Sequence, residues 1–442
     1  MIGLLGYYGI IVPFPCYNYN DFMVKRILSI ILAVLIIILL AGAVIAYSRG
    51  YRIDLDKKTL STTGILSVAS YPQQASIILD GKLTSVTNAS LTLSPDWYDL
   101  RVSRDGYQNW EKRVRVQGEV VTQIDALLIP TNPSLRALTT SGILAPSLSG
   151  SGTQVAYIVP QDESIPATGS PPKTGVWIIE LRSSTLPLSG RSQPRQVFAT
   201  RTAYDWPNST LTWSPDERAL MITFINPDRI GVNPKDKNKP VNRALLISLV
   251  ATSESILSGT DVTATYKTIL SQWSKDQKEE NDVQIATLPP IVSNLLTNSA
   301  SQIQFAPDDK KILYVATASA TLAPVISPSL IGSNSTQESR TITSGAYYVY
   351  DRKEDKNFLI TDGKTLASPT TIRWYSDAKH IILIEKDTIN IIDYDGTNKR
   401  TVYAGPFEKT TLFSWPQGGK IVITTNLNNS KQLPNLYEVD LR

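Results

Sequence analysis

Cysteine and histidine are almost absent from the 442-residue sequence, which has only Cys16 and His380. An intrachain disulfide needs two cysteines, and a Cys/His zinc site of the structural kind needs four such ligands. A Ser–His–Asp or Cys–His mechanism would have to use His380. These shortages exclude the disulfide and the zinc site and leave few common hydrolase mechanisms. We therefore predict no catalytic residue, no metal and no cofactor.

Charge is also sparse, because Asp, Glu, Lys and Arg make up 19% of the chain, below the roughly 25% typical of soluble domains. The 43 basic and 39 acidic residues leave a net charge of +4. This excess is too small and too scattered to predict nucleic-acid binding. Hydrophobic residues reach 42%, which is too many for disorder. With many Ser, Thr, Asn and Pro residues, the composition predicts an all-β chain with frequent turns and more than one domain.

One long apolar run is present, from Ile27 to Ser48, and it contains no charged residue. At ~1.5 Å per residue it is about 33 Å long, enough to cross a hydrocarbon core of about 30 Å. Lys25 and Arg26 precede the run, and Tyr47 lies at its far end, at interface depth. The pattern predicts a transmembrane helix over 27–48. A cleaved signal peptide is the alternative, with Val44-Ile45-Ala46 as the cleavage site, although the run exceeds a usual signal core.

The N-terminal segment 1–26 fits a membrane anchor poorly before Met23, because residues 1–22 contain no Lys or Arg. Met23-Val24-Lys25-Arg26 followed by the apolar run is typical of a signal-anchor start. We expect translation to begin at Met23, in which case the mature chain lacks Cys16.

After a linker over 49–63, residues 64–130 alternate apolar and polar side chains with period two, as in half-buried strands. Asp80-Gly81 and Asp105-Gly106 are hairpin signals, because glycine takes the positive φ that these turns require. Ser94-Pro95-Asp96 marks a further turn. The pattern predicts a small antiparallel β-sandwich over 64–130.

This segment resembles the PEGA domain family in Ser70–Ala75, Ile78–Gly81, Leu91–Tyr98 and Gly106–Trp110. It departs from the family in reading Pro72-Gln73-Gln74-Ala75 at the name-giving tetrad and in having Asp96 where glycine is usual. The resemblance implies a bacterial, extracytoplasmic surface module and assigns no catalytic residue. The residues to which it gives structural roles are Pro72, Asp80, Gly81, Pro95, Tyr98, Gly106, Tyr107 and Trp110.

From residue 133 to 442 a degenerate unit recurs, made of an aromatic or apolar residue, a tight turn and an apolar strand. The five visible copies begin at Leu148, Trp213, Phe305, Trp374 and Trp415. Each is followed by a second apolar strand. A small sheet of this kind cannot bury both faces alone, so the sheets must stack against one another. The repeat predicts a β-propeller over 133–442.

The copies are similar to the Trp-Ser-Pro-Asp-Gly core of TolB-like and WD-type propeller repeats. Glu217, Asp309 and Ala378 stand where that core has glycine. Five blades are visible, and long insertions leave the expected number at about five to seven. The residues with structural roles in the repeat are Trp213, Pro215, Asp216, Phe305, Pro307, Asp308, Trp374, Asp377 and Trp415.

A short helical insertion is expected at about 261–297. Tyr266, Ile269, Leu270 and Trp273 follow the spacing of an amphipathic helix, with Asp261 as its N-cap. Pro289-Pro290 begins a second helix. The insertion is interpreted as a cover over a blade edge, with a partner-docking arm as the alternative.

Three further features receive structural interpretations. His380 is expected to be an exposed loop or strand-edge residue and not a catalytic one. Asp393-Tyr394-Asp395-Gly396 lacks the third acid and the distal glutamate of a calcium loop, so it indicates a hairpin. Residues 234–240 are basic but mixed, which indicates a solvated loop.

Together these features predict a single-pass membrane protein whose PEGA-like module and propeller lie outside the cytoplasm. The predicted role is non-enzymatic docking of an envelope protein or a cell-wall glycan, without nucleic acid. One alternative is a carboxylate-based envelope glycan hydrolase or lyase. The other is a cytosol-facing docking protein, because Arg49, Arg52, Lys57 and Lys58 follow the apolar run.

Overall fold

The computed structural model describes residues 19–48, 51–54, 59–160, 173–181, 193–200, 204, 206–224, 243–250, 258–330, 332–366, 372–427 and 433–441. These residues form two compact units. The second unit comprises 68–89, 97–115 and 123–442, so it includes strands of the PEGA-like segment together with the C-terminal sheets. The first unit comprises the described residues before Val68, with 90–96 and 116–122. The predictions for the loop at 234–240 and for Met1–Asn18 lie outside the described residues.

Helix α1 (Tyr19–Ser48) contains the predicted membrane span. Residues Arg26–Ile45 are long and apolar enough to cross a membrane, and none of that window is buried within the protein. Arg26 and Ile27 are exposed, as lipid- and interface-facing residues would be. The side chains of Lys25 and Tyr47 lie outside the described residues. The helix begins at Tyr19, before Met23, whereas the predicted transmembrane helix began at Ile27. An apolar helix of this length is consistent with a single-pass membrane anchor or with a signal sequence.

After α1, a two-stranded sheet pairs β1 (Tyr51–Asp54) with β2 (Thr59–Thr62). Two further sheets follow in the PEGA-like segment. One has the order β6-β3-β9, with β3 (Gly64–Tyr71), β6 (Ala89–Leu93) and β9 (Val121–Leu127). The other has the order β5-β4-β7-β8, with β4 (Ser76–Leu79), β5 (Lys82–Val86), β7 (Asp96–Ser103) and β8 (Trp110–Val116).

Period-two alternation decides which side chains these strands bury. Ile77 and Leu79 of β4 are buried, as are Val114 and Val116 of β8, whereas their sequence neighbours are more exposed. Apolar side chains on one face of each strand supply the core of this small module.

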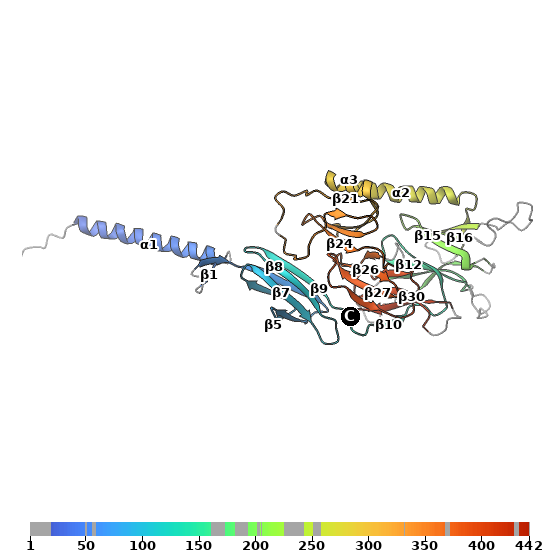
Figure 1. Cartoon of the computed structure of the whole chain (residues 1–442), viewed down its shortest axis with the longest axis horizontal. Helices are drawn as coiled ribbons and strands as arrows, with labels where there is room; N and C mark the ends of the chain where they lie inside the picture. The colour runs from blue at the N-terminus through green and yellow to red at the C-terminus, as the bar shows by residue number, and fades with distance from the viewer. Residues whose placement is uncertain are drawn as a thin grey trace, which may run out of the picture. The chain divides into compact units, whose positions relative to one another are not determined.

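Five four-stranded antiparallel sheets form the C-terminal part of the described chain (Figure 1). The first sheet contains β11 (Leu144–Leu148), β12 (Gln154–Val159), β13 (Gly175–Glu180) and β14 (Arg195–Ala199). A short 3-10 helix, η1 (Trp206–Asn208), precedes the second sheet, which contains β15 (Ser209–Trp213), β16 (Ala219–Phe224), β17 (Arg243–Ser248) and β18 (Thr260–Asp261).

The third sheet contains β19 (Ala300–Phe305), β20 (Lys311–Ala316), β23 (Tyr347–Asp351) and β24 (Lys356–Thr361), with the small pair β21 (Ala320–Thr321) and β22 (Thr341–Ile342) inserted. The fourth contains β25 (Ile372–Trp374), β26 (His380–Glu385), β27 (Thr388–Asp393) and β28 (Arg400–Tyr403). The fifth contains β29 (Leu412–Ser414), β30 (Lys420–Thr425), β31 (Asn435–Asp440) and β10 (Ser134–Ala137). Because β10 pairs with β31, the first strand of this region completes the last sheet, which closes the propeller.

Apolar side chains from adjacent sheets pack together at four of the blade interfaces. The first and second sheets share one buried cluster, and so do the third and fourth, the fourth and fifth, and the fifth and first. Representative pairs are Ile158 with Ile222, Leu313 with Ile381, Ile391 with Ile421, and Tyr157 with Val422. This face-to-face packing of small sheets gives the propeller predicted from the repeat.

The turn after the first strand of every sheet has the same geometry, although the residues differ. Its fourth residue has positive φ in all five copies: Gly152, Glu217, Asp309, Ala378 and Gly418. In each copy that residue donates its N–H to the carbonyl oxygen three residues earlier, as Glu217 does to Ser214 at 2.9 Å and Ala378 does to Tyr375 at 3.2 Å. The backbone conformation of this turn is therefore the same in all five copies, even where another residue stands in place of glycine.

Two tryptophans occupy equivalent places in this repeat. Trp213 donates its indole N–H to the carbonyl oxygen of Ser147 at 3.1 Å, and Trp374 donates to that of Gln304 at 3.0 Å. Both acceptors lie next to a bulge in the first strand of the preceding sheet. Trp374 is buried and Trp213 is half-buried.

Replacing Asp309 by glycine should stabilise the protein. Asp309 has a φ of 56° and is exposed, and glycine adopts that conformation without the steric cost of a β-carbon. We expect a gain of about 0.5–1 kcal/mol in the free energy of unfolding, measured by urea denaturation of the full chain in detergent. Lys310→Gly, next to it and not at positive φ, should instead lower stability. A loss of stability in Asp309→Gly would contradict this account.

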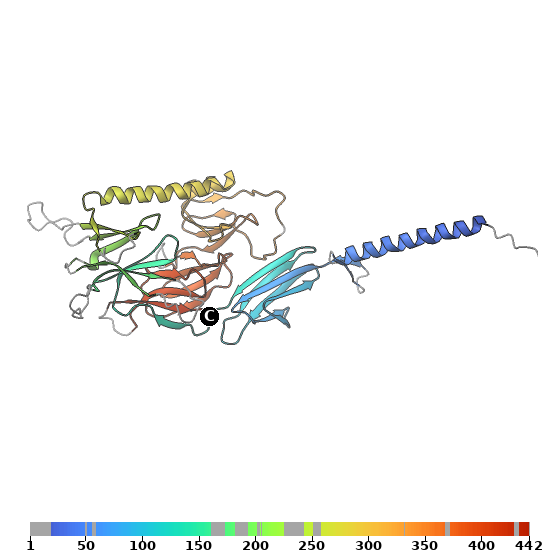
Figure 2. The same ribbon diagram turned by 180° about the vertical axis from the view of Figure 1, so that it is seen from behind.

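Helix α2 (Tyr266–Ala286) and helix α3 (Pro290–Ser299) form the insertion. Figures 1 and 2 show α2 extending from the β15–β18 sheet toward the β19–β24 sheet. α3 buries Val292, Leu295 and Leu296 with apolar residues of the third sheet, whereas α2 buries no residue. The prediction of Asp261 as the N-cap is wrong, because α2 begins at Tyr266 with Thr265 at its N-cap position, whereas Asp261 lies in β18 and accepts the backbone N–H of Thr263 at 3.0 Å.

Candidate functional site

The candidate site is built where turns of the fourth sheet meet strand β8, within one compact unit. Strand β27 ends at Asp393, the connection from β27 to β28 carries Asp395, and the turn before β26 carries Asp377. β8 contributes Trp110 and Lys112. We call Lys112, Asp377, His380, Asp393 and Asp395 the buried ion cluster.

Lys112 is the cation that β8 brings to this cluster. Its Nζ lies 2.5 Å from Oδ2 of Asp395 and 3.8 Å from Oδ2 of Asp393, and all three side chains are less than 10% exposed. Trp110 donates its indole N–H to Oδ2 of Asp393 at 3.2 Å. The predicted core residue Trp110 is buried, and its polar edge is bound to a residue 283 positions away. These contacts join a strand of the PEGA-like segment to the propeller.

His380 lies between two carboxylates. Its Nδ1 is 2.6 Å from Oδ2 of Asp377, and its Nε2 is 3.2 Å from Oδ1 of Asp393. Burial lowers the pKa of His380, but the two carboxylates outweigh burial and raise it to about 10. The imidazole is therefore protonated at neutral pH. The expectation of an exposed histidine is wrong: His380 is the first residue of β26 and is 4% exposed.

Two carboxylates of the cluster, those of Asp377 and Asp395, are held in their ionised form. Burial raises the pKa of Asp395, but Lys112, Thr397 and Thr336 together lower it to about 2. Burial likewise raises the pKa of Asp377, and the charge of His380 and its hydrogen bonds lower it overall. Asn334 and Thr336 also donate to Oδ2 of Asp395, at 2.6 and 2.7 Å. Such fixed, ionised carboxylates suit structural ion pairing better than proton donation, which needs a raised pKa.

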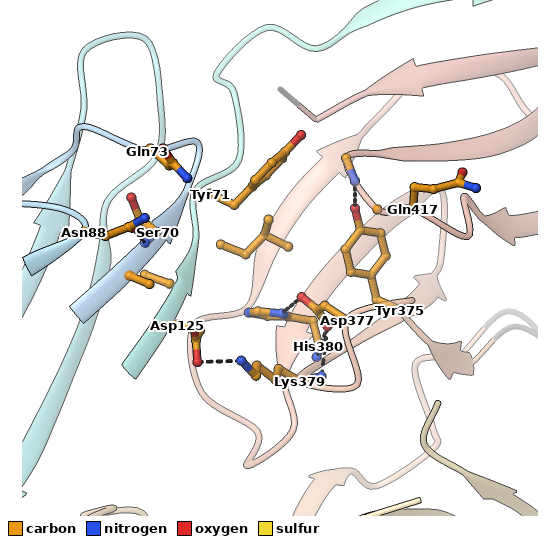
Figure 3. Close-up of a pocket in the computed structure, with 15 residues that line it drawn as sticks. Ser70, Tyr71, Gln73, Asn88, Asp125, Tyr375, Asp377, Lys379, His380 and Gln417 are labelled. Atoms are coloured by element: carbon orange, nitrogen blue, oxygen red, sulfur yellow. Dashed lines mark hydrogen bonds and ion pairs between the residues drawn. The ribbon is translucent and has the colours of Figure 1, made fainter. Parts of the chain in front are cut away.

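A cavity of about 320 Å³ lies beside the cluster. Figure 3 shows Ser70, Tyr71, Gln73 and Asn88 of the PEGA-like segment facing Tyr375 and His380 of the propeller. Lys379 forms an ion pair with Asp125 at the edge of the cavity, with Nζ and Oδ2 2.5 Å apart. Tyr375 is buried and its hydroxyl accepts the N–H of Gly419. The lining combines aromatic rings, amides and exposed backbone, which can bind a polar ligand by hydrogen bonds and ring contact.

Most of the predicted structural residues lie in turns away from this cavity. Asp216 and Asp308 each accept a backbone N–H two residues on, from Arg218 and Lys310. Pro215 and Phe305 are half-buried, Pro307 is exposed, and Trp415 is buried. Of the predicted propeller residues, only Asp377 lies in the site.

The predicted residues of the PEGA-like segment are also mainly structural in position. Asp80 and Gly81 both have positive φ, as their hairpin requires, and Asp80 accepts the N–H of Asp99 at 2.9 Å. Gly106 has a φ of 81°. Pro72, Tyr98 and Tyr107 are half-buried and Pro95 is exposed. Trp110 alone among them contacts the cluster.

Sequence reasoning missed Lys112, His380, Asp393 and Asp395 as a group. The available signal was the density of acids around the only histidine, in Asp377-Ala378-Lys379-His380 and Asp393-Tyr394-Asp395. No group of three or more His, Cys, Asp or Glu side chains suited to a metal ion occurs among the residues that the structure describes.

The segment that provides β8 can be assigned to a family from its sequence. Residues 63–132 match the PEGA domain family. The PEGA domain thus supplies Ser70, Tyr71, Gln73 and Asn88 to the cavity and Lys112 to the cluster. No curated protein matches the sequence.

Solved structures similar to this chain include TolB proteins. A TolB structure from Agrobacterium tumefaciens has 12% identity and a TM-score of 0.21, with 65% of this chain and 71% of that chain covered. TolB from Acinetobacter baumannii has 12% identity and a TM-score of 0.21, with 78% and 59% covered, so the match spans less than two thirds of that protein. An oligogalacturonate lyase in complex with manganese has 11% identity and a TM-score of 0.20, with 78% and 74% covered.

Proposed function

We propose that this chain is a membrane-anchored docking protein whose PEGA domain and propeller lie outside the cytoplasm and bind an envelope protein or a cell-wall glycan. The cavity of Figure 3 carries the proposal, because the PEGA domain and the propeller both line it within one compact unit. A ligand bound there would be held by both modules at once. The anchor α1 would keep that ligand close to the membrane.

Non-enzymatic binding is favoured by the state of the carboxylates beside the cavity. A glycoside hydrolase of the usual kind needs a protonated carboxylic acid near its second carboxylate. Asp377 and Asp395 have lowered pKa values and fixed cationic partners. Their arrangement supports a structural role that holds the two modules in place around the cavity.

A single labelling experiment tests both orientation and docking. Gln73 is exposed at the cavity, and Lys278 is exposed on α2. Gln73→Cys and, as the matched control, Lys278→Cys are made in a Cys16→Ser background. A membrane-impermeant maleimide that carries a benzophenone is added to cells of the native host, which are then irradiated.

We expect both variants to be labelled before lysis, and only Gln73→Cys to give a cross-linked product of higher mass. Peptides of a second protein in the product, found by mass spectrometry, identify a protein ligand, and loss of the added mass on muramidase treatment identifies a glycan. Labelling that requires lysis would place the modules in the cytoplasm. Equal cross-linking at both positions would contradict a ligand seated in this cavity.

A further inference from the structure

A second cavity, of about 430 Å³, is lined in part by Lys112, His380 and Asp393 of the buried ion cluster. It is lined by β8 and by the hairpin turns of the third and fourth sheets. Lys379 and His380 line both cavities. The feature that distinguishes this second cavity is Lys311, the first residue of β20.

Lys311 is a buried cation without an anionic partner in the described part of the chain. It is 8% exposed, and its Nζ lies 4.6 Å from the ring centroid of Tyr394. Three of the four other lysines that line the cavity are paired, Lys112 with Asp395, Lys379 with Asp125 and Lys310 with Asp308, and the fourth, Lys353, is exposed. Lys311 therefore differs from the other lysines of the cavity in being buried and having no carboxylate partner among the described residues.

The acid closest to Lys311 in the sheet does not satisfy it. Asp351 is the ladder partner of Lys311 across β20 and β23. However, Oδ1 of Asp351 accepts the backbone N–H groups of Lys353 and Glu354, at 2.8 and 3.1 Å, so this carboxylate closes its own hairpin. No ion pair within 4.0 Å joins Lys311 to a carboxylate among the described residues.

Burial of an ammonium group is costly unless a counter-charge or a set of hydrogen bonds replaces water. The ring of Tyr394 recovers only part of that cost. An anion inside the cavity would supply the remainder. Lys353 lines the same cavity, is exposed, and has no ion pair among the described residues, so it offers a second ammonium at the rim.

We propose that this cavity binds the carboxylate group of a small polar ligand, with Lys311 as the main contact and Lys353 as a secondary one. A single negative charge fits better than a phosphate, because Asp308, Asp351 and Glu354 also line the cavity and would repel a dianion. The volume suits one acidic sugar or one acidic amino-acid residue. The inference rests on the proposed function insofar as the carboxylate would belong to the docked envelope ligand.

Binding of defined probes to the full chain in detergent tests the proposal. The probes are sodium glucuronate for an acidic sugar, N-acetylglutamate for a peptide acid, glucose as the neutral match and inorganic phosphate. Dissociation constants are measured by ligand-observed NMR at constant ionic strength. We expect at least one carboxylate probe to bind more tightly than both glucose and phosphate, and the better probe identifies the source of the carboxylate.

Substitutions at Lys311 and Lys353 test whether these residues bind the carboxylate probe. Lys311→Met should weaken binding at least tenfold and Lys353→Met about threefold. Lys275→Met, a control on α2 whose lysine is exposed and paired with Glu279 outside the cavity, should leave binding within twofold of the unchanged protein. Lys311→Arg keeps the charge and should retain most of the binding, which keeps the test valid if Lys311→Met folds poorly.

Equal binding by Lys311→Met and the unchanged protein would overturn the proposal, as would tighter binding of phosphate or no binding of either carboxylate. The cross-linking at Gln73 is a separate measurement. If Gln73→Cys cross-links while neither carboxylate binds, the carboxylate site is wrong and the docking function stands.

Discussion

Lys112→Met should lower the free energy of unfolding by about 3–5 kcal/mol, because it leaves Asp395 buried without its cation and removes one of the two cations beside Asp393. The methionine side chain retains most of the packing volume, so the loss reports mainly on charge. Urea denaturation of the full chain in detergent, followed by tryptophan fluorescence, measures the effect.

Arg101→Met provides the matched control on the neighbouring strand. Arg101 forms an ion pair with Glu111 at 2.7 Å, but both side chains are about half exposed. Exposed pairs of this kind contribute between 0 and about 1 kcal/mol. If Lys112→Met costs no more than Arg101→Met, the cluster does not hold β8 to the propeller.

Replacing both Lys112 and Asp395 tests whether the stability lost in Lys112→Met comes from an unpaired buried charge. In Lys112→Met/Asp395→Asn, the amide still accepts hydrogen bonds from Asn334 and Thr336 while the uncompensated charge is removed. We expect the double variant to recover part of the stability lost in Lys112→Met, since buried charges cost most when unpaired.

Local sequence signals predicted the elements that depend on local physics. The period of Tyr266, Ile269, Leu270 and Trp273 gave a helix, and Asp80-Gly81 gave a hairpin with positive φ at both residues. The Pro-Asp turns predicted the repeat of the propeller, because proline and aspartate shape their own backbone. Each of these features is decided by residues within about one turn of one another.

The site depended on contacts between distant residues, which a single sequence does not show. Trp110 and Asp393 are 283 positions apart, and nothing in the local pattern around either one indicates the other. His380 follows a tight turn, so its position alone suggested exposure. It is buried because Asp377 and Asp393 provide two carboxylates for its ring. Ala378 and Glu217 adopt positive φ without glycine, so their residue types do not reveal the turn geometry that these two copies share with the others.

His380→Gln should be the second strongly destabilising change, with a loss of about 3–5 kcal/mol near pH 7, because a buried cation is removed from between two carboxylates. The size of this loss should depend on pH. The pKa of His380 is raised from 6.5 to about 10 on folding, so the folded protein holds the proton more tightly than the unfolded chain. The stabilisation is therefore fully present below about pH 6.5 and declines as pH rises toward 10.

Unfolding midpoints of the unchanged protein and His380→Gln, measured between pH 6 and pH 10, should accordingly converge at the alkaline end. Lys379→Met is the control, since Lys379 is next in sequence and its ion pair with Asp125 is partly exposed. Its effect should be smaller than that of His380→Gln, because an ion pair between partly exposed side chains contributes at most about 1 kcal/mol. A difference between the unchanged protein and His380→Gln that stays constant up to pH 10 would mean that His380 is neutral in the folded protein. In that case the carboxylates of Asp377 and Asp393 would have to be balanced by Lys112 and backbone N–H groups alone.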